Sequence, residues 1–238
     1  PATQVCNFKT ISKFSDTAAL DKFARSCNVI TYEFENIPIE AVEKTNNLTN
    51  VYPKPKNLQV AQDRLLEKKF LTNCGIKVSP FFSISNYDEL VEGFDKLNSY
   101  GILKTRRLGY DGKGQFAAES IDEVFQAWKK LNSVPCIFEK KIYFEKEISS
   151  IITRTITGET AEFDISENNH KNGILITSKV PASISLNSVT KAKEISKLIA
   201  EKLDYVGTLA VEMFLCNDDE ILVNEIAPRV HNTGHWTI

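Results

Sequence analysis

Residues 211–225 read VEMFLCNDDEILVNE, two apolar stretches separated by the polar turn residues NDDE. This pattern predicts a β-hairpin. If the turn is centred between Asp218 and Asp219, Glu212 and Glu225 lie directly opposite each other. Opposed carboxylates repel, at a cost of up to about 1 kcal/mol, whereas Mg²⁺ between them would be a suitable partner because it prefers hard oxygen ligands. The alternative is a pair of solvent-facing glutamates, which the apolar neighbours of Glu225 disfavour.

The segment that follows the hairpin, APRVHNTGHW, is rich in polar groups. It places Arg229, His231, Asn232 and His235 within seven positions. An arginine and a histidine beside a metal carboxylate can hold a carbonate, a carboxyphosphate or a substrate phosphate. The alternative is that these side chains make only structural contacts.

A glycine-rich stretch, LKTRRLGYDGKGQ, occupies residues 103–115. Glycines 109, 112 and 114 allow positive φ and a close approach of backbone N–H groups to an anion, and Lys104 precedes them on an apolar strand. The stretch lacks the Lys-Ser/Thr pair of a Walker A loop and does not fit GxGxxG. A plain hairpin turn is the alternative.

The rest of the chain divides into an N-terminal part and a longer C-terminal part. A helix over 16–25 and a strand over 27–34 resemble the end of a doubly wound α/β domain, and the prolines of VYPKPK predict a boundary near Lys56. One helix is expected over 58–73, closed by Gly75.

Beyond Gly75, residues 76–142 contain two helical patterns, at 88–97 and 121–131, among short strands. They predict a small α+β module with its own core. Further on, EISSIITRT and GETAEFD predict a hairpin around Gly158, and 191–203 predicts a helix.

Composition excludes some classes of protein. The 238 residues carry a net charge of −2 and are 42% hydrophobic, which is ordinary for a globular protein and does not favour nucleic-acid or membrane-surface binding. No apolar run approaches a membrane span and no signal peptide is visible. Five scattered cysteines without a CxxC pair are typical of free thiols in the cytoplasm.

Four strings together resemble the 5-(carboxyamino)imidazole ribonucleotide synthase family of ATP-grasp ligases. They are TYEFENIP (31–38), QDRLLEKKFL (62–71), LKTRRLGYDGKGQ (103–115) and NEIAPRVHNTGHWTI (224–238), and the resemblance runs over the whole chain. It implies an α/β and α+β fold: a partial, Rossmann-like pre-ATP-grasp domain over 1–55 and an ATP-grasp domain over 56–238, with a lid over about 76–142. It also implies that family segments are missing before Pro1 and after Ile238.

The resemblance implies ATP-dependent carboxylation of 5-aminoimidazole ribonucleotide with bicarbonate, in purine biosynthesis. ATP and Mg²⁺ would be the cofactors, and a cytoplasmic homodimer without nucleic-acid or membrane partners would be the enzyme. Two alternatives are a non-catalytic nucleotide-binding remnant and a carboxylating ligase with a different acceptor, which HNTGHW disfavours.

The resemblance also implies roles for individual residues. Glu212 and Glu225 would bind magnesium, with Asn224 beside them. Arg229, His231, Lys104, Tyr110 and Glu35 (or Glu33) would serve catalysis and the acceptor. The nucleotide would be bound by Lys68, Lys104, Gly109, Tyr110, Asp111, Gly112, Lys113, Gly114, Gln115, Glu139, Lys140, Lys141, Ile142, Glu147 and His170.

Overall fold

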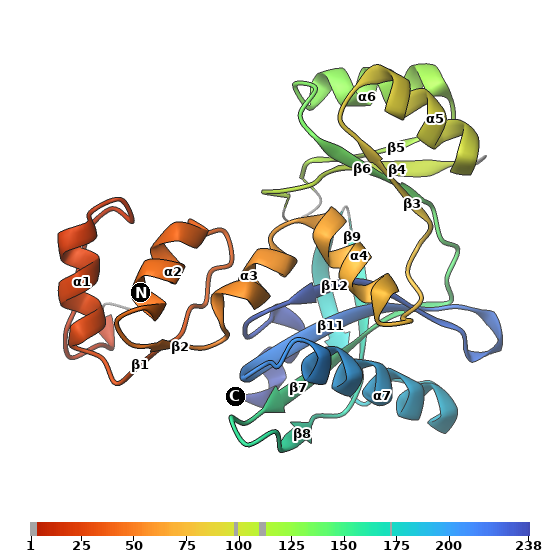
Figure 1. Ribbon diagram of the computed structural model, residues 1–238. Helices are drawn as coiled ribbons and strands as arrows, with labels where there is room; N and C mark the ends of the chain where they lie inside the picture. Colours follow the sequence, from red (N-terminus) through yellow and green to blue (C-terminus); the bar gives the residue numbers. More distant parts are fainter. Residues whose placement is uncertain (1–3, 98–99, 110–112, 172) are drawn as a thin grey trace.

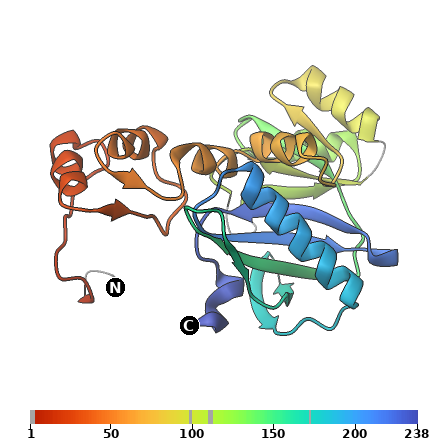
Figure 2. The same cartoon turned by 60° about the horizontal axis from the view of Figure 1, so that its bottom comes forward.

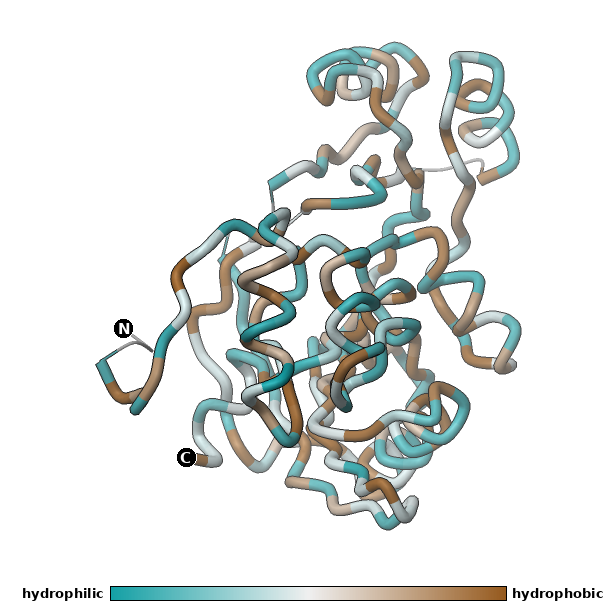
Figure 3. Tube along the Cα trace, turned by 60° about the vertical axis from the view of Figure 1, so that its left-hand side comes forward, coloured by the Kyte–Doolittle hydropathy of each residue, from teal (hydrophilic) through white to brown (hydrophobic). Residues whose placement is uncertain are grey.

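The computed structural model describes residues 4–97, 100–109, 113–171 and 173–238. The chain forms an N-terminal unit, a small module where the lid is predicted, and a larger body. Two helices, α3 (Pro55–Ala61) and α4 (Arg64–Asn73), lie where the three meet (Figures 1 and 2). The helices alternate between hydrophilic and hydrophobic residues (Figure 3), as expected when one side of each helix packs on a core. No helix in the described ranges has the length and apolar character that crossing a membrane requires.

The N-terminal unit contains α1 (Thr17–Arg25), β1 (Val29–Ile30), α2 (Ile39–Asn46) and β2 (Asn50–Val51). The two strands pair in parallel, and a small apolar cluster of Val42, Val51 and Leu58 fills the space between these elements. The strand expected over 27–34 is wrong in length. Only Val29 and Ile30 pair with a neighbouring strand, which is itself two residues long.

Two helices, α3 (Pro55–Ala61) and α4 (Arg64–Asn73), replace the single helix expected over 58–73. Asp63 leaves the helical conformation, with φ −128° and ψ 108°, and its carboxylate accepts the N–H groups of Leu65 and Leu66. The Gln62 amide donates to the carbonyl oxygens of Glu35 and Ile37, at 2.6 and 2.7 Å. The break therefore provides an N-cap for α4 and a contact to the N-terminal unit. Gly75, at φ +75°, ends α4 as expected.

The lid is a four-stranded antiparallel sheet in the order β3-β6-β4-β5. Its elements are β3 (Phe81–Ile84), α5 (Tyr87–Leu97), β4 (Gly101–Thr105), β5 (Gln115–Ala118), α6 (Ile121–Lys130) and β6 (Cys136–Lys140). Both helices cover the same face of the sheet, away from the body (Figure 1). The buried apolar side chains under them form a cluster separate from the body's core, which confirms a module with its own core. The expected start at residue 76 is wrong, because Ile76 packs in the body's core.

The body consists of one β-sheet with helices packed against it. Its sheet has the order β10-β9-β7-β11-β12, with β8 also paired to β7. The elements are β7 (Lys146–Arg154), β8 (Thr160–Glu162), β9 (Ser166–Lys171), β10 (Ile174–Lys179), α7 (Leu186–Lys202), β11 (Gly207–Leu215), the 3-10 turn η2 (Asn217–Asp219), β12 (Ile221–Ala227) and the 3-10 helix η3 (Asn232–Thr237). Pairing of β7 with β8 confirms the hairpin expected around Gly158.

The strands of the body separate a core from a polar face. Leu209, Val211 and Met213 of β11 point into the apolar core, together with side chains of α4 and α7. Glu212 and Phe214, which alternate with them, line a cavity instead. The alternation along one strand thus places a carboxylate on the side of the sheet that faces the lid.

Candidate active site

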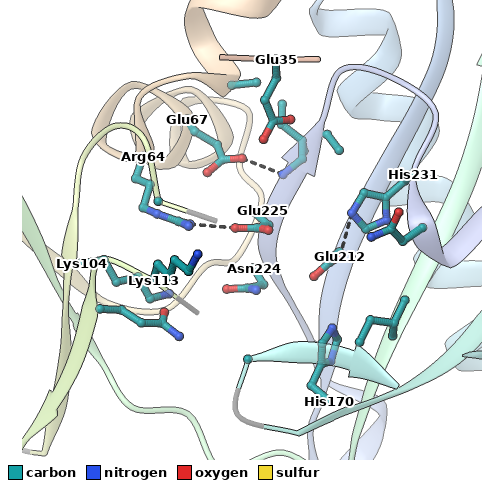
Figure 4. Close-up of a pocket in the computed structure, with 18 of the residues that line it drawn as sticks. Glu35, Arg64, Glu67, Lys104, Lys113, His170, Glu212, Asn224, Glu225 and His231 are labelled. Atoms are coloured by element: carbon teal, nitrogen blue, oxygen red, sulfur yellow. Dashed lines mark hydrogen bonds and ion pairs between the residues drawn. The ribbon is translucent and has the colours of Figure 1, made fainter. Parts of the chain in front are cut away.

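A cavity of about 460 Å³ lies between the body, the lid and the N-terminal unit. Strands β11 and β12 contribute Glu212, Asn224 and Glu225, whereas the lid contributes Lys104 and the described part of the glycine-rich loop. Charged side chains of opposite sign face each other across the cavity (Figure 4).

Glu212 and Glu225 are paired directly across β11 and β12, as the sequence predicts. The hairpin is not symmetric, however: Met213 pairs with Val223 and Leu215 with Ile221, which centres the turn on Asp218. A register shift follows Glu212, so Asn224 is an extra residue in β12. This β-bulge restores the opposition of the two glutamates. The predicted pair is confirmed, and the turn centre between Asp218 and Asp219 is wrong.

The two carboxylates have different neighbours. Arg64 of α4 forms an ion pair with Glu225 at 2.7 Å, and His231 Nε2 lies 3.3 Å from Glu212 (Figure 4). Burial and the nearby Glu225 charge raise the pKa of Glu212 to about 8. Burial also opposes ionisation of Glu225, but the charges of Arg64, Lys104 and His231 together outweigh it and lower that pKa to about 2. Burial and the Arg229 charge lower the pKa of His231 to about 4.

The donor atoms here fit a magnesium ion that shares ligands with a phosphate. No group of three or more His, Cys, Asp or Glu side chains in the described ranges could hold a metal by itself. The two glutamates supply carboxylate oxygens, and the Oδ1 atom of Asn224, the residue before Glu225, is buried without a hydrogen-bond partner among the described residues. Mg²⁺ commonly completes such a set with phosphate oxygens and water.

A buried charged cluster joins the lid to the body. Lys104 Nζ lies 3.0 Å from Glu139 Oε2, and Lys68 Nζ lies 3.5 Å from the same oxygen. Burial would raise the pKa of Glu139, but the two lysines and Arg64 together lower it to about 2. Lys104 lines the cavity, whereas Lys68 is not among its described lining residues. The structure thus brings together two residues predicted to bind phosphate, and only one of them lies at the cavity wall.

Other predicted nucleotide residues lie on or beside the connection from lid to body. Glu139 and Lys140 end β6, and Lys141 and Ile142 follow it before β7 begins. Glu147 on β7 and His170 on β9 are hydrogen-bonded through the His170 Nδ1 atom, which raises the pKa of His170. Both of these side chains line the cavity, whereas residues 139–142 are not among its described lining residues.

The glycine-rich loop is described only in part, because Tyr110, Asp111 and Gly112 lie outside the described residues. Gly109, Lys113 and Gln115 line the cavity. Gly114 has the expected positive φ of +75°, and a Cβ atom there would come within 2.7 Å of Thr105 Oγ1. Gly109 does not use the positive φ that glycine allows, whereas its neighbour Leu108 has a φ of 63°.

The end of the cavity away from the lid is formed by the N-terminal unit and the segment after β12. Arg229 Nε donates to Glu35 Oε2 at 3.0 Å, and both residues line the cavity. His231 and Asn232 also line it. Of the two glutamates expected near the acceptor, the described lining residues include Glu35 and not Glu33, and they do not include His235.

Sequence reasoning missed two residues of α4, Arg64 and Glu67, which both line the cavity. Glu67 is 2% exposed and accepts the N–H of Ile226 at 2.6 Å. Burial and the Glu225 charge raise the pKa of Glu67 to about 8. The available signal was their spacing of three residues, which places both on one helix face. Local sequence does not indicate that this face meets β12.

Comparison with known families identifies both parts of the chain. Residues 1–62 match the ribonucleotide synthetase preATP-grasp domain, and residues 69–238 match the ATP-grasp domain.

Curated relatives carry the same name in several bacteria. The N5-carboxyaminoimidazole ribonucleotide synthases of Brucella melitensis and Bacillus subtilis are 44% and 38% identical over 239 and 238 residues. All of this chain is covered in both cases, and the chain spans 66% and 63% of the length of these two relatives.

Solved structures agree with this likeness. An N5-carboxyaminoimidazole ribonucleotide synthetase in an ADP complex has a TM-score of 0.95 at 39% identity, covering 100% of this chain and 63% of that one. The Aspergillus clavatus enzyme in complex with ADP and 5-aminoimidazole ribonucleotide has a TM-score of 0.92 at 28% identity, with the same coverage. The chain therefore belongs to the ATP-grasp family, with a preATP-grasp domain of the ribonucleotide synthetase type ahead of its ATP-grasp domain.

Proposed function

We propose that this protein catalyses the ATP-dependent carboxylation of 5-aminoimidazole ribonucleotide by bicarbonate, in purine biosynthesis. The observation that carries the proposal is a single cavity with two distinct ends. Opposed carboxylates, Glu212 and Glu225, lie near the lid cation Lys104, and the Arg229–Glu35 pair lies toward the N-terminal unit. Longer relatives, of whose length this chain spans 66% and 63%, bear the name of this activity.

The residues at the lid end of the cavity are suited to bind a nucleoside triphosphate. Glu212, Glu225 and Asn224 would hold Mg²⁺, which when bound neutralises phosphate charge. Lys104 and Lys113 face the same cavity, and their ammonium groups would stabilise the γ-phosphoryl group as its negative charge shifts. Glu147 and His170 line the cavity as a hydrogen-bonded pair suited to the nucleoside. Contact of Lys68 and of residues 139–142 with the nucleotide remains a prediction.

The residues at the acceptor end suit a small anion and an amine. Transfer of the phosphoryl group to bicarbonate gives carboxyphosphate. Its carboxyl carbon then bonds to the acceptor amine, which loses a proton as phosphate leaves. Arg229 would orient the carboxyphosphate oxygens, and Glu35 would hold Arg229 in place. Lid closure excludes water, which would otherwise hydrolyse this intermediate.

Other features of the enzyme belong to the same proposal. The division at residue 55, the end of the lid near residue 142, a homodimer and a cytoplasmic location are proposed from the resemblance. Light scattering during size-exclusion chromatography tests the dimer.

Phosphate release from Mg-ATP with bicarbonate, measured with and without 5-aminoimidazole ribonucleotide, tests the function. We expect the ribonucleotide to increase the rate, and we expect Glu225→Gln to abolish the increase while Glu220→Gln, an exposed control on the same hairpin, preserves it. Nucleotide binding without this increase would instead favour a non-catalytic nucleotide-binding protein. An increase with another amine alone would favour a ligase with a different acceptor.

A further inference from the structure

Helix α4 contacts three successive residues of β12 at the site. Lys68 Nζ donates to the carbonyl oxygen of Asn224 at 2.8 Å, and Arg64 pairs with the Glu225 carboxylate at 2.7 Å. Glu67 Oε1 accepts the N–H of Ile226 at 2.6 Å (Figure 4). One helix thus holds the backbone before Glu225, its side chain, and the backbone after it.

The environment of Lys68 argues against a direct role on phosphate. Its side chain is 0% exposed, which is rare for lysine. An ammonium has three donors, and three acceptors surround this one: the carbonyl oxygens of Asn224 and Val223, and the Glu139 carboxylate. To reach a phosphate oxygen, Lys68 would have to give up one of these contacts and leave a buried acceptor without its donor.

The contacted residues are the ones that set the register of the site. Asn224 is the extra residue of the β-bulge, and the bulge places Glu225 opposite Glu212. A one-residue slip in a strand turns its side chains to the other face of the sheet. Without the bulge, therefore, the pairing seen nearer the turn would carry Glu225 away from Glu212. Contacts on both sides of Glu225 favour the bulged register.

We propose that Glu67 and Lys68 are positioning residues that hold the bulge at Asn224, and so keep Glu225 opposite Glu212 for a metal–nucleotide complex. The inference rests on the proposed function only in taking these two carboxylates as ligands of a nucleotide-bound divalent cation. Neither residue needs to contact the nucleotide for this role.

Calorimetric titration of ADP, with Mg²⁺ and with EDTA, separates positioning from phosphate binding. For Lys68→Met we expect metal-free ADP to bind as it does to the wild type. Affinity for Mg-ADP should fall by about 10- to 100-fold, the usual loss when the partners of metal ligands are removed. Lys69→Met, an exposed neighbour on the same helix, is the matched control and should leave both affinities unchanged.

Glu67 provides a second pair of variants in case Lys68→Met does not fold, which a thermal melt would reveal. Glu67→Gln keeps an oxygen acceptor for the Ile226 N–H and should retain Mg-ADP affinity, whereas Glu67→Leu loses the acceptor and should reduce it. Retention by glutamine would not be expected if the Glu67 charge acted directly on the metal.

Three results would overturn the inference. Equal losses of metal-free and Mg-ADP affinity in Lys68→Met would make Lys68 a phosphate ligand. Unchanged affinities in both Lys68→Met and Glu67→Leu would make the contacts irrelevant to the site. Equal wild-type affinities with and without Mg²⁺ would remove the metal dependence itself. Because the titration needs neither bicarbonate nor an acceptor, failure of the proposed carboxylation leaves it intact.

Discussion

Among single residues, Glu67 links the pH of the solution to the stability of the site. Burial raises its pKa to about 8 in the folded protein, from 4.5 as the ordinary value. A carboxyl group with a raised folded pKa contributes stability that is complete below the unfolded pKa and is lost as pH rises through the folded pKa. We therefore expect the metal-free protein to lose stability between about pH 5 and pH 8, by a few kcal/mol at most.

Urea unfolding across this pH range, in EDTA, measures the effect. Glu67→Gln cannot ionise and should show a shallower decline than the wild type, while Glu220→Gln should follow the wild type. Identical slopes for the wild type and Glu67→Gln would show that the carboxyl group does not titrate in this interval.

Replacing Arg229 should reduce the use of the acceptor more than the binding of the nucleotide. The Arg229 guanidinium pairs with Glu35 of the N-terminal unit, whereas Lys104 belongs to strand β4 of the lid. Charge-assisted hydrogen bonds are worth about 1.5–3 kcal/mol, so Arg229→Met should lower kcat/KM for the ribonucleotide by about 10- to 100-fold. ADP affinity should stay constant, and Arg25→Met on α1 is an exposed control. A comparable loss of ADP affinity would place Arg229 at the nucleotide instead.

What sequence predicts for single residues depends on how local the signal is. The opposition of Glu212 and Glu225 follows from two strands joined by a short turn, and it was correctly predicted although the turn is offset by a bulge. Arg64 and Glu67 give no comparable signal, because their role depends on where α4 docks against β12. That docking is a property of the tertiary structure.

Among the structural elements, the break between α3 and α4 deserves an experiment because Asp63 has two roles. It caps α4, and it accepts two hydrogen bonds from Arg106 of the segment after β4, at 3.0 and 2.7 Å. Asp63→Ala removes both and should lower the free energy of unfolding by about 1–3 kcal/mol. Asp63→Asn keeps a capping oxygen and should lose less. Equal losses in the two variants, measured by urea unfolding, would mean that capping contributes little.

A mutation in the lid's core should reduce the protection of the lid's amides from hydrogen exchange without affecting the body. Leu103 is fully buried in the lid's own apolar cluster, and Leu→Ala at such a site costs about 2–5 kcal/mol. In Leu103→Ala we expect faster hydrogen exchange in β3–β6, with unchanged exchange in α7 and β11. Leu209→Ala, in the body's core, should show the reverse pattern. Uniform acceleration in both variants would indicate one cooperative unit.

Helix and strand bounds could be predicted from sequence where they depend on local residues, but not where they depend on contacts with distant parts of the chain. Gly75 marks the end of α4 in the sequence and in the structure, because its positive φ is a local property. The single helix over 58–73 failed because Gln62 and Asp63 make contacts with distant carbonyls and with Arg106. An aspartate just before an apolar helical stretch is nonetheless an N-cap signal, and it could have indicated the break.

For the whole molecule, the cavity wall combines contributions from all three parts of the chain. A ligand that bridges them should stabilise the folded protein by mass action, at about 2.7 kcal/mol when its concentration is 100 times Kd. We expect Mg-ADP to raise the melting temperature, and we expect EDTA or Glu225→Gln to remove most of that rise. A rise that is insensitive to both would place the nucleotide away from the paired carboxylates.

The overall fold was best predicted from long motifs rather than from single residues. The four resembling strings are spread over the chain from residue 31 to residue 238, and the family matches cover 1–62 and 69–238. The layered arrangement of the N-terminal unit, lid and body could be expected from that resemblance. The contacts by which α3 and α4 join them could not, because they depend on side chains far apart in the chain.

The bulge at Asn224 also bears on how the gene can change in length. In a regular strand, the loss of one residue turns all side chains on one side of the deletion to the opposite face of the sheet. Here a codon lost between Ile221 and Asn224 can be absorbed by straightening the strand, so Glu225 keeps its orientation. A codon lost just after Glu225 cannot be absorbed in this way, because straightening the bulge would then move Glu225 itself. Tolerance of deletions should therefore be sharply one-sided around this glutamate.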